Sequence, residues 1–194
     1  MGGEEIDNSL FQANVLLPGT GSTNNPYDAV PSTIAANFNS IYLKKIKGKL
    51  LSAEKQTPLT DYANSLSAQL KSRPLRINTG RDPENAEKYF AELLSAFLRQ
   101  QGVKVGQKII RGTVDKQLLF YTHTNSKSLA EMIRAMMKYS TNFLANQLIL
   151  VLSSEAYQRP ANKADVQHYM EQTLSKHFHW KNFVIKDGAG LSRD

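Results

Sequence analysis

The chain has 194 residues, of which 41% are hydrophobic, and it carries 24 Lys and Arg against 17 Asp and Glu, a net charge of +7. This length suits one or two globular domains, and the charge favours anionic partners such as nucleic acid, anionic lipid or an acidic polymer. The chain has no cysteine, which excludes disulfides and thiolate chemistry, and no run of roughly 18 apolar residues that could span a membrane.

Residues 1–33 are rich in turn formers and predict an irregular segment that wraps the surface, ahead of a single domain over residues 34–194. The first residues, Met1 to Glu5, do not have the apolar core of a signal peptide. Gly19 to Asn24 faintly resembles a phosphate-cradling loop. Asn25-Pro26 follows this loop where a phosphate site needs a helix, so we reject that interpretation.

The middle of the chain alternates between predicted strands and helices. Residues 34–44 predict a strand, Gly48 a turn, and Leu50 and Leu51 a short second strand. Basic residues are densest here, between Lys44 and Lys49, but no aromatic residues are interleaved with them. A solvated face is therefore favoured over a nucleic-acid-binding surface, and we expect no nucleic-acid partner.

Two helices and two short strands follow. Residues 58–71 predict a modest helix. A clearer helix begins with Asp82 as its cap and Pro83 in its first turn, and ends at Gly102. The predicted buried face of this helix consists of Phe90, Leu93, Leu94, Phe97 and Leu98. Two short strands are predicted near residues 107–111 and 117–122.

A pair of helices then meets at Ser140-Thr141-Asn142. Ser128 and Glu131 have the spacing of a capping box at the start of the first helix. Its predicted buried face consists of Leu129, Met132, Ile133, Met136 and Met137. Residues 148–152 are apolar at every position, which is typical of a helix buried all round. The pattern places a hydroxyl and a carboxamide between two core helices, on a support rigid enough for a functional site.

A last helix is predicted over residues 163–176, and a strand over residues 181–185. The strand enters the glycine-rich turn that begins at Asp187, and such a turn normally leads into another element. We therefore expect the domain to be truncated at both ends. His177 and His179 have no carboxylate or cysteine at ligand spacing, so we expect no metal site.

The tripeptide Ser-Thr-Asn occurs twice, and its meaning depends on its context. At Ser22 it lies in a turn-rich loop, where serine and asparagine are expected for backbone reasons. At Ser140 two interpretations stay open. Ser140 and Asn142 can be a helix-capping serine beside a structural asparagine, or the polar groups of a site.

The stretch from Lys138 to Leu148 resembles the Ser-x-Asn helix of the D-alanyl-D-alanine carboxypeptidase/endopeptidase family, the low-molecular-mass penicillin-binding proteins that act on peptidoglycan. Three further stretches are similar to that family in the same order, so the resemblance covers nearly the whole chain. They are Asn25 to Pro31 leading to Asn37-Phe38-Asn39, Asp82 to Val105, and Asp187 to Arg193.

The resemblance implies an α+β fold, with helices packed on a mainly antiparallel sheet, that forms part of a penicillin-binding transpeptidase domain. It implies a serine-type carboxypeptidase that works through an acyl-enzyme, with peptidoglycan stem peptides and β-lactam antibiotics as partners of the full-length parent. It implies no metal or organic cofactor, and a location in the periplasm or cell envelope. It does not specify the oligomeric state.

The resemblance also assigns roles to two residues. Ser140 matches the serine that relays protons near the nucleophile's lysine and to the leaving amine, and Asn142 matches the asparagine that holds the substrate's peptide group. Two positions depart from the family pattern: Thr141 stands where the family usually has Asp or Asn, and Ala189 where the glycine-rich turn usually has Ser.

The nucleophile of such an enzyme needs Ser-x-x-Lys on one helical turn. The single match is Ser52 with Lys55, a weak candidate, because Pro58 follows closely and disfavours a helix. No Lys-Thr-Gly, the third motif, occurs in the chain. We therefore expect the isolated chain to be inactive. The alternative is a non-catalytic truncated homologue that binds peptidoglycan or a partner protein.

Overall fold

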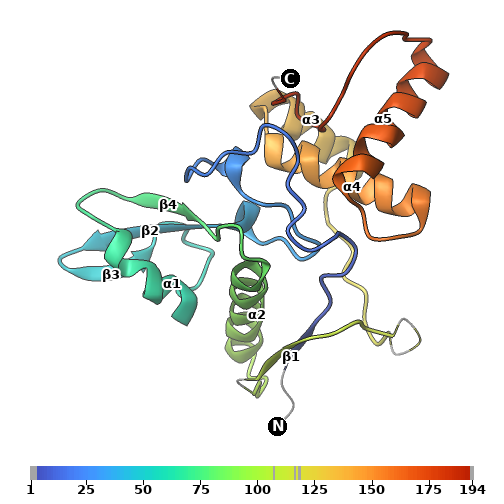
Figure 1. Cartoon of the computed structure of the whole chain (residues 1–194). Coiled ribbons are helices and arrows are strands. Elements are labelled where there is room, and N and C mark those ends of the chain that lie inside the picture. Colours follow the sequence, from blue (N-terminus) through green and yellow to red (C-terminus); the bar gives the residue numbers. More distant parts are fainter. Residues whose placement is uncertain (1–3, 107, 116, 118, 193–194) are drawn as a thin grey trace.

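The computed structural model describes residues 4–106, 108–115, 117 and 119–192 (Figure 1). It has the predicted α+β architecture. The elements in chain order are β1 (Glu4–Ile6), the 3-10 turns η1 (Pro26–Asp28) and η2 (Asn37–Asn39), β2 (Ser40–Ile46), β3 (Lys49–Ser52), α1 (Asp61–Ser65), η3 (Leu66–Gln69), β4 (Leu75–Asn78), α2 (Pro83–Gln100), β5 (Ile109–Arg111), α3 (Leu129–Tyr139), α4 (Asn142–Tyr157) and α5 (Lys163–Phe178).

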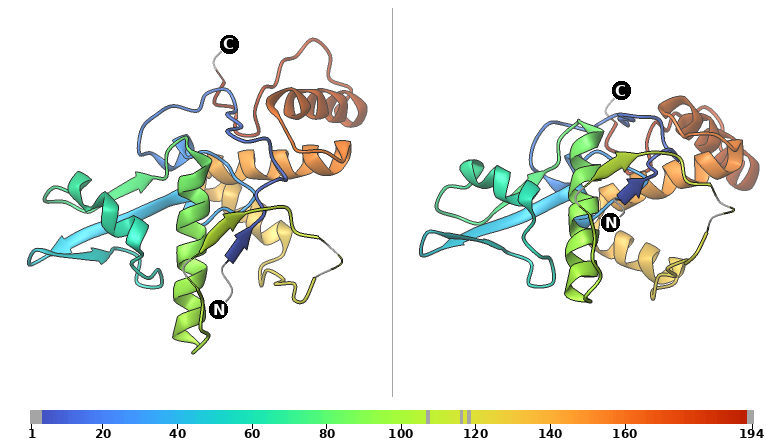
Figure 2. Two further views of the ribbon diagram at one scale, coloured as in Figure 1. Left: turned by 60° about the horizontal axis from the view of Figure 1, so that its bottom comes forward. Right: turned by 90° about the horizontal axis from the view of Figure 1, so that it is seen from below.

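The main sheet is antiparallel, with strand order β3-β2-β4. The helices α1 and α2 pack against it, and Tyr62 and Leu93 join Ile41, Leu43 and Ile77 in one buried apolar cluster. This sheet and its helices lie on one side of the molecule, and α3, α4 and α5 lie on the other (Figures 1 and 2). We call the first group the sheet unit and the second the helical unit.

The helical unit has its own apolar core, to which the N-terminal segment contributes. Phe11, Val15 and Leu17 pack with Ile149, Leu150, Ala161 and Val166. Phe11 and Ala161 also form a short parallel bridge. The N-terminal segment has little regular structure beyond β1 and η1, and parts of it are buried against α4 and α5. Residues 1–3 lie outside the described part of the chain.

Several predicted strands differ from the observed ones. The strand expected over residues 34–44 begins only at Ser40, because Asn37, Phe38 and Asn39 all have positive φ angles (49°, 59° and 47°) and turn the chain. The two-stranded parallel sheet of β1 and β5 includes the strand predicted near residues 107–111. The described residues among 117–122, and residues 181–185, are not in strands. Residues 107 and 118 lie outside the described chain.

The start and end of α2 are as predicted, but its buried face is not. Leu93 is buried, whereas Leu94 and Phe97 are 40% and 44% exposed. The helix contacts the sheet unit through Tyr89 and Leu93. On another face it carries polar side chains that reach β1 and β5: Ser95 Oγ donates to Glu4 Oε1 (2.8 Å), and Glu87 accepts from Arg111 (2.8 and 2.9 Å). Two contact faces of different chemistry therefore replace the single apolar stripe.

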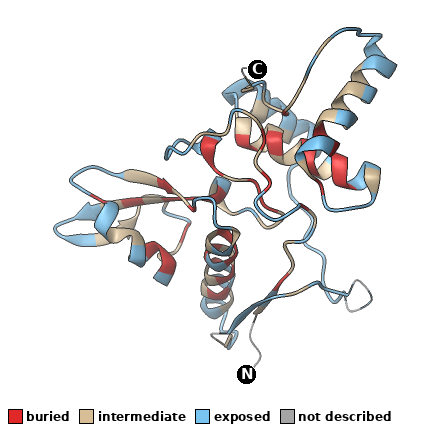
Figure 3. Ribbon diagram, viewed as in Figure 1, coloured by how far each residue is buried: buried red, intermediate tan, exposed pale blue. Residues whose placement is uncertain are grey.

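The helix α3 begins with the predicted capping box of Ser128 and Glu131, but its apolar face is not buried. None of the residues of α3 is buried, and Leu129, Ile133 and Met137 are 58%, 40% and 71% exposed. By contrast, α4 has buried residues along its length (Figure 3). The prediction of two core helices is therefore right only in part for α4, where Ile149 and Leu150 are buried but Leu152 is 47% exposed, and it is wrong for α3, whose apolar face is mostly exposed.

No helix in the described residues is long and apolar enough to cross a bilayer.

Candidate functional site

Ser140 lies between α3 and α4 in the left-handed backbone conformation, with φ 50° and ψ 51°. Its N–H donates to the Met136 carbonyl, which ends α3, and its side chain is exposed. Gln158 and His179 end α4 and α5 in the same conformation, which is common at the ends of helices. The left-handed turn places the hydroxyl in solvent beside the first turn of α4.

Asn142 is the first residue of α4 and is half-buried. The N-cap of α4 is Thr141, whose side chain makes no capping hydrogen bond. Within the described residues, neither the Ser140 hydroxyl nor the Asn142 amide has a hydrogen-bond partner. Ser140 therefore ends α3 through its backbone N–H, but its hydroxyl does not cap α4. Both polar groups remain available to a molecule that approaches the α3–α4 junction.

The first turns of α4 rest on the left-handed turn at residues 37–39. The rings of Phe38 and Phe143 meet edge to face, with centroids 5.8 Å apart. Gln147 Nε2 donates to the Ser32 carbonyl (2.5 Å), and Asn39 Nδ2 donates to Ser32 Oγ (2.9 Å). Asn39 is 1% exposed. A buried polar network therefore fixes the helix that carries Asn142.

The turn that begins at Asp187 supports α4 from its other side. The Asp187 carboxylate is buried and accepts from the N–H groups of residues 189–192, at 2.5 to 3.3 Å. The N–H of Gly188 donates to Asn146 Oδ1 (2.9 Å). A Cβ atom on Gly188 would lie 2.6 Å from the Ala145 carbonyl oxygen, so only glycine allows this close approach to α4.

The loop from Gly19 to Asn24 is filled by a carboxylate of the chain itself. Asp28 Oδ1 accepts from the Gly21 N–H (2.6 Å), and Asp28 Oδ2 accepts from the N–H and hydroxyl of Thr23 (3.3 and 2.5 Å). The loop therefore does hold an anionic group, but this group is the buried side chain of Asp28. This agrees with the rejection of a phosphate site there.

Ser52 and Lys55 lie away from the α3–α4 junction. Ser52 is the last residue of β3, in the sheet unit, and Lys55 follows in a turn and not in a helix. The Ser52 hydroxyl donates to the Glu54 carbonyl (2.9 Å) and accepts from the Glu54 N–H (3.2 Å). Since β3 and α4 are on opposite sides of the molecule (Figure 1), this chain does not bring Ser52 together with Ser140.

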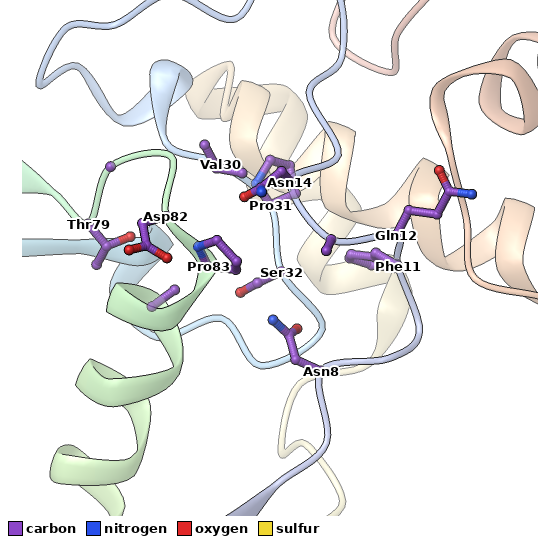
Figure 4. A pocket seen from close by; sticks show the side chains of 13 residues that line it. Asn8, Phe11, Gln12, Asn14, Val30, Pro31, Ser32, Thr79, Asp82 and Pro83 are labelled. Carbon is purple, nitrogen blue, oxygen red and sulfur yellow. The ribbon is translucent and has the colours of Figure 1, made fainter. Parts of the chain in front are cut away.

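A cavity lies where the N-terminal segment, residues 30–32 and the start of α2 meet (Figure 4). Asn8, Ser32 and Asp82 are among its lining residues, and neither Ser140 nor Asn142 is. The Asn8 amide is engaged on both sides: Nδ2 donates to Glu87 (2.9 Å), and Oδ1 accepts from the Thr33 N–H (2.8 Å). This cavity is therefore a gap between packed segments of the chain, and it is separate from the Ser140 site. In the described residues, no cluster of His, Asp and Glu could hold a metal.

The residues that support the site could not all be found from sequence. Asn146 lies inside the Lys138–Leu148 stretch, and Asp187 opens a recognisable glycine-rich turn. Gln147 gains its role only through a contact with Ser32, 115 positions away. Asn39 and Asp28 bond to residues five to nine positions away, but no recognised spacing marks these contacts in the sequence.

Comparison with known proteins places this arrangement in a family. The model of the D-Ala-D-Ala carboxypeptidase 3 (S13) family matches residues 5–194. D-alanyl-D-alanine carboxypeptidase DacB of Haemophilus influenzae is 30% identical over 111 residues, which cover 57% of this chain and 23% of the relative.

Two solved structures have the same fold. The crystal structure of penicillin binding protein 4 from Haemophilus influenzae matches with a TM-score of 0.67 at 20% identity, covering 97% of this chain and 49% of that chain. Its complex with a novel β-lactam matches with a TM-score of 0.58 at 21% identity, covering 84% and 45%. The chain thus spans less than half the length of these relatives. The match to their fold confirms the predicted transpeptidase-like architecture, and the family match over residues 5–194 shows that the chain belongs to the D-Ala-D-Ala carboxypeptidase 3 (S13) family.

Proposed function

We propose that this chain is the Ser-x-Asn-bearing part of a serine-type D-alanyl-D-alanine carboxypeptidase that acts on peptidoglycan stem peptides in the periplasm or cell envelope. The observation that carries the proposal is the pair of unengaged polar side chains of Ser140 and Asn142, held at the α3–α4 junction. Support comes from the family match and from the buried contacts that fix α4.

In the proposed reaction, a serine attacks the peptide bond between two D-alanines and forms an ester, and water then hydrolyses that ester. The proton lost by the attacking serine passes to the departing amine. The Ser140 hydroxyl can accept this proton and donate its own, because a hydroxyl is both donor and acceptor. The Asn142 amide has a donor and an acceptor that can hold the substrate's peptide group.

The nucleophile and the strand that binds the substrate's terminal carboxylate are not among the polar groups around Ser140. We propose that polypeptide outside these 194 residues supplies both, and that the isolated chain is inactive. Catalytic groups that act as a unit lose nearly all activity when one is missing. The relative complexed with a β-lactam makes a fluorescent penicillin a suitable probe.

The first experiment incubates the isolated chain with a fluorescent penicillin and measures its intact mass. We expect no covalent adduct, with a soluble penicillin-binding enzyme as positive control. A stoichiometric adduct that maps to Ser52 or Ser140, and that disappears when that serine is changed to Ala, would contradict the proposal and make the chain a compact enzyme by itself.

The second experiment uses the protein made from the complete coding sequence. We expect acylation at a serine outside residues 1–194, slowed roughly 10²–10⁴-fold by Ser140→Ala, the usual loss for an acid–base group. Ser22→Ala is the matched control, because Ser22 begins the other Ser-Thr-Asn tripeptide and is exposed. It should not change the rate. A complete protein that is never acylated would favour the non-catalytic homologue that binds peptidoglycan or a partner.

A further inference from the structure

The end of α5 and the loop that follows it form a protruding tip, residues 176–184, which extends away from the rest of the molecule (Figures 1 and 2). Three large apolar side chains of this tip face solvent: Phe178, Trp180 and Val184 are 61%, 50% and 63% exposed. The tip residues belong to neither apolar core. Exposed apolar groups clustered in this way usually mark a surface that binds something.

The aromatic side chains of the tip form one cluster. The Trp180 ring lies 6.1 Å from the Phe178 ring and 5.7 Å from the Phe183 ring, measured between centroids. The backbone beneath them is fixed: His179 ends α5 in the left-handed conformation and its N–H donates to the Ser175 carbonyl (3.1 Å). The rings are therefore presented by an ordered turn.

The same tip is positively charged. Lys176 and Lys181 belong to the same stretch as the aromatic residues, and no acidic residue occurs between Glu171 and Asp187. Among the described residues, neither lysine forms an ion pair. The tip thus combines apolar rings with unneutralised charge of a single sign.

The exposed apolar face of α3 has a different composition from the tip. That face is aliphatic apart from Tyr139 at its end, its helix carries Glu131 as well as Arg134 and Lys138, and nothing in the structure shows what covers it. Aromatic rings flanked by lysines are instead the composition that settles at the interface between lipid headgroups and acyl chains.

We propose that the tip docks the protein peripherally on an anionic lipid bilayer, with Trp180 and Phe178 at the headgroup boundary and Lys176 and Lys181 facing lipid phosphates. The proposal goes beyond the carboxypeptidase function and does not depend on it. The contact is weak and reversible, because it consists of a few rings and two lysines.

Trp180 makes the test specific, because it is the only tryptophan in the chain. The 194-residue chain is titrated with vesicles of phosphatidylcholine alone or mixed with phosphatidylglycerol, and tryptophan emission is recorded. We expect a blue shift and quenching by brominated lipid with the anionic vesicles only, reversed by high salt. Equal binding to both vesicle types, or no shift with either, would overturn the proposal. The protein made from the complete coding sequence is then sedimented with the same vesicles, and failure of that protein to bind the anionic vesicles would also overturn the proposal.

Paired variants show whether the tip itself binds. Lys176→Gln with Lys181→Gln should lower the partition coefficient about five-fold per lysine, the usual effect of one basic residue near an anionic surface. Lys47→Gln with Lys49→Gln removes the same charge from the exposed end of the β2–β3 hairpin and should have a smaller effect. An equal effect of the two pairs would contradict docking through the tip.

Phe178→Ser tests the apolar part without changing charge, and circular dichroism checks that each variant is folded. It should weaken binding and reduce the depth of Trp180 measured with brominated lipid. A second copy of the chain could instead cover the tip. In that case the blue shift would depend on protein concentration without lipid, and sedimentation would show a dimer, which would overturn the proposal.

Discussion

Tyr89 is the largest side chain that is fully enclosed by the protein, and its hydroxyl accepts from Asn37 Nδ2 (3.1 Å). The Tyr62 ring lies 6.4 Å from the Tyr89 ring in the same core. Burial raises the pKa of both hydroxyls above the usual 10.0, and the carboxylates of Asp82 and Glu92 raise the pKa of Tyr62 further. The folded state therefore keeps both protons at a pH where the unfolded chain loses them.

This shift predicts a loss of stability in alkali. Below pH 10 both states are protonated and the free energy of unfolding keeps its full value. As the pH rises from about 10 through the folded-state pKa values, only the unfolded state ionises, and the free energy of unfolding falls. Urea unfolding at several pH values between 8 and 11 measures the slope. Tyr89→Phe should reduce it, whereas Tyr121→Phe, at a 74% exposed tyrosine, should not. Equal slopes for all three proteins would contradict the effect of burial.

Gly188 decides how closely the Asp187 turn approaches α4. A Cβ at this position would also lie 2.9 Å from Ile149 Cγ2, so Gly188→Ala should cost about 1–3 kcal/mol, the usual cost of overpacking. Gly190→Ala is a useful comparison, since a Cβ there meets nothing within 4 Å and only the positive φ of 71° is strained. We expect it to cost about 1 kcal/mol. Thermal unfolding measures both costs. If Gly188→Ala leaves the stability unchanged, the turn does not pack closely against α4.

At the scale of elements, α2 offers two neighbouring leucines in opposite environments. Leu93 is 6% exposed in the core of the sheet unit, and Leu94 is 40% exposed. Leu93→Ala should cost about 2–5 kcal/mol, and Leu94→Ala under about 1 kcal/mol. Chemical denaturation of the two variants gives both values. If Leu94→Ala lowered the free energy of unfolding more than Leu93→Ala does, the single apolar face predicted from the sequence would be supported.

The sequence predicted the position of most helices because the repeat of apolar residues and the capping residues are local. It could not predict which face of α2 or α3 is covered. The repeat of apolar residues identifies an apolar face, but it does not identify the element that packs on that face. The predicted start of the strand at residue 34 is too early. Asparagine tolerates a positive φ, but the sequence does not indicate that Phe38 also adopts one. The short strand β4, between Pro74 and Gly80, was missed, although Leu75 and Ile77 alternate with polar residues.

For the site, the sequence placed Ser140 and Asn142 at a helix boundary, where the structure has them. The predicted roles of these two residues stay proposals. The contact beneath them was not predictable, because the bond of Gln147 to Ser32 depends on how the N-terminal segment crosses α4.

At the scale of the whole molecule, the two apolar cores should respond separately to mutation. Leu43 and Leu150 are both completely buried, one in each core. Leucine to alanine at either position should cost about 2–5 kcal/mol. Native-state hydrogen exchange should then show the loss of protection mainly in β2 and β4 for Leu43→Ala, and in α4 and α5 for Leu150→Ala. A uniform loss in both variants would mean that the cores unfold as one.

The contacts around α4 also indicate the order in which parts of the chain fold during synthesis. The sheet unit, from β2 to α2, uses a continuous stretch of chain, so it can form soon after that stretch leaves the ribosome. The helix that carries Asn142 instead needs Phe11 and Leu17 from one end of the chain and the Asp187 turn from the other, and Leu191 lies directly against Gly19. Contacts between such distant positions form slowly. The region around Ser140 is therefore the last part of the described chain to gain its supports during synthesis.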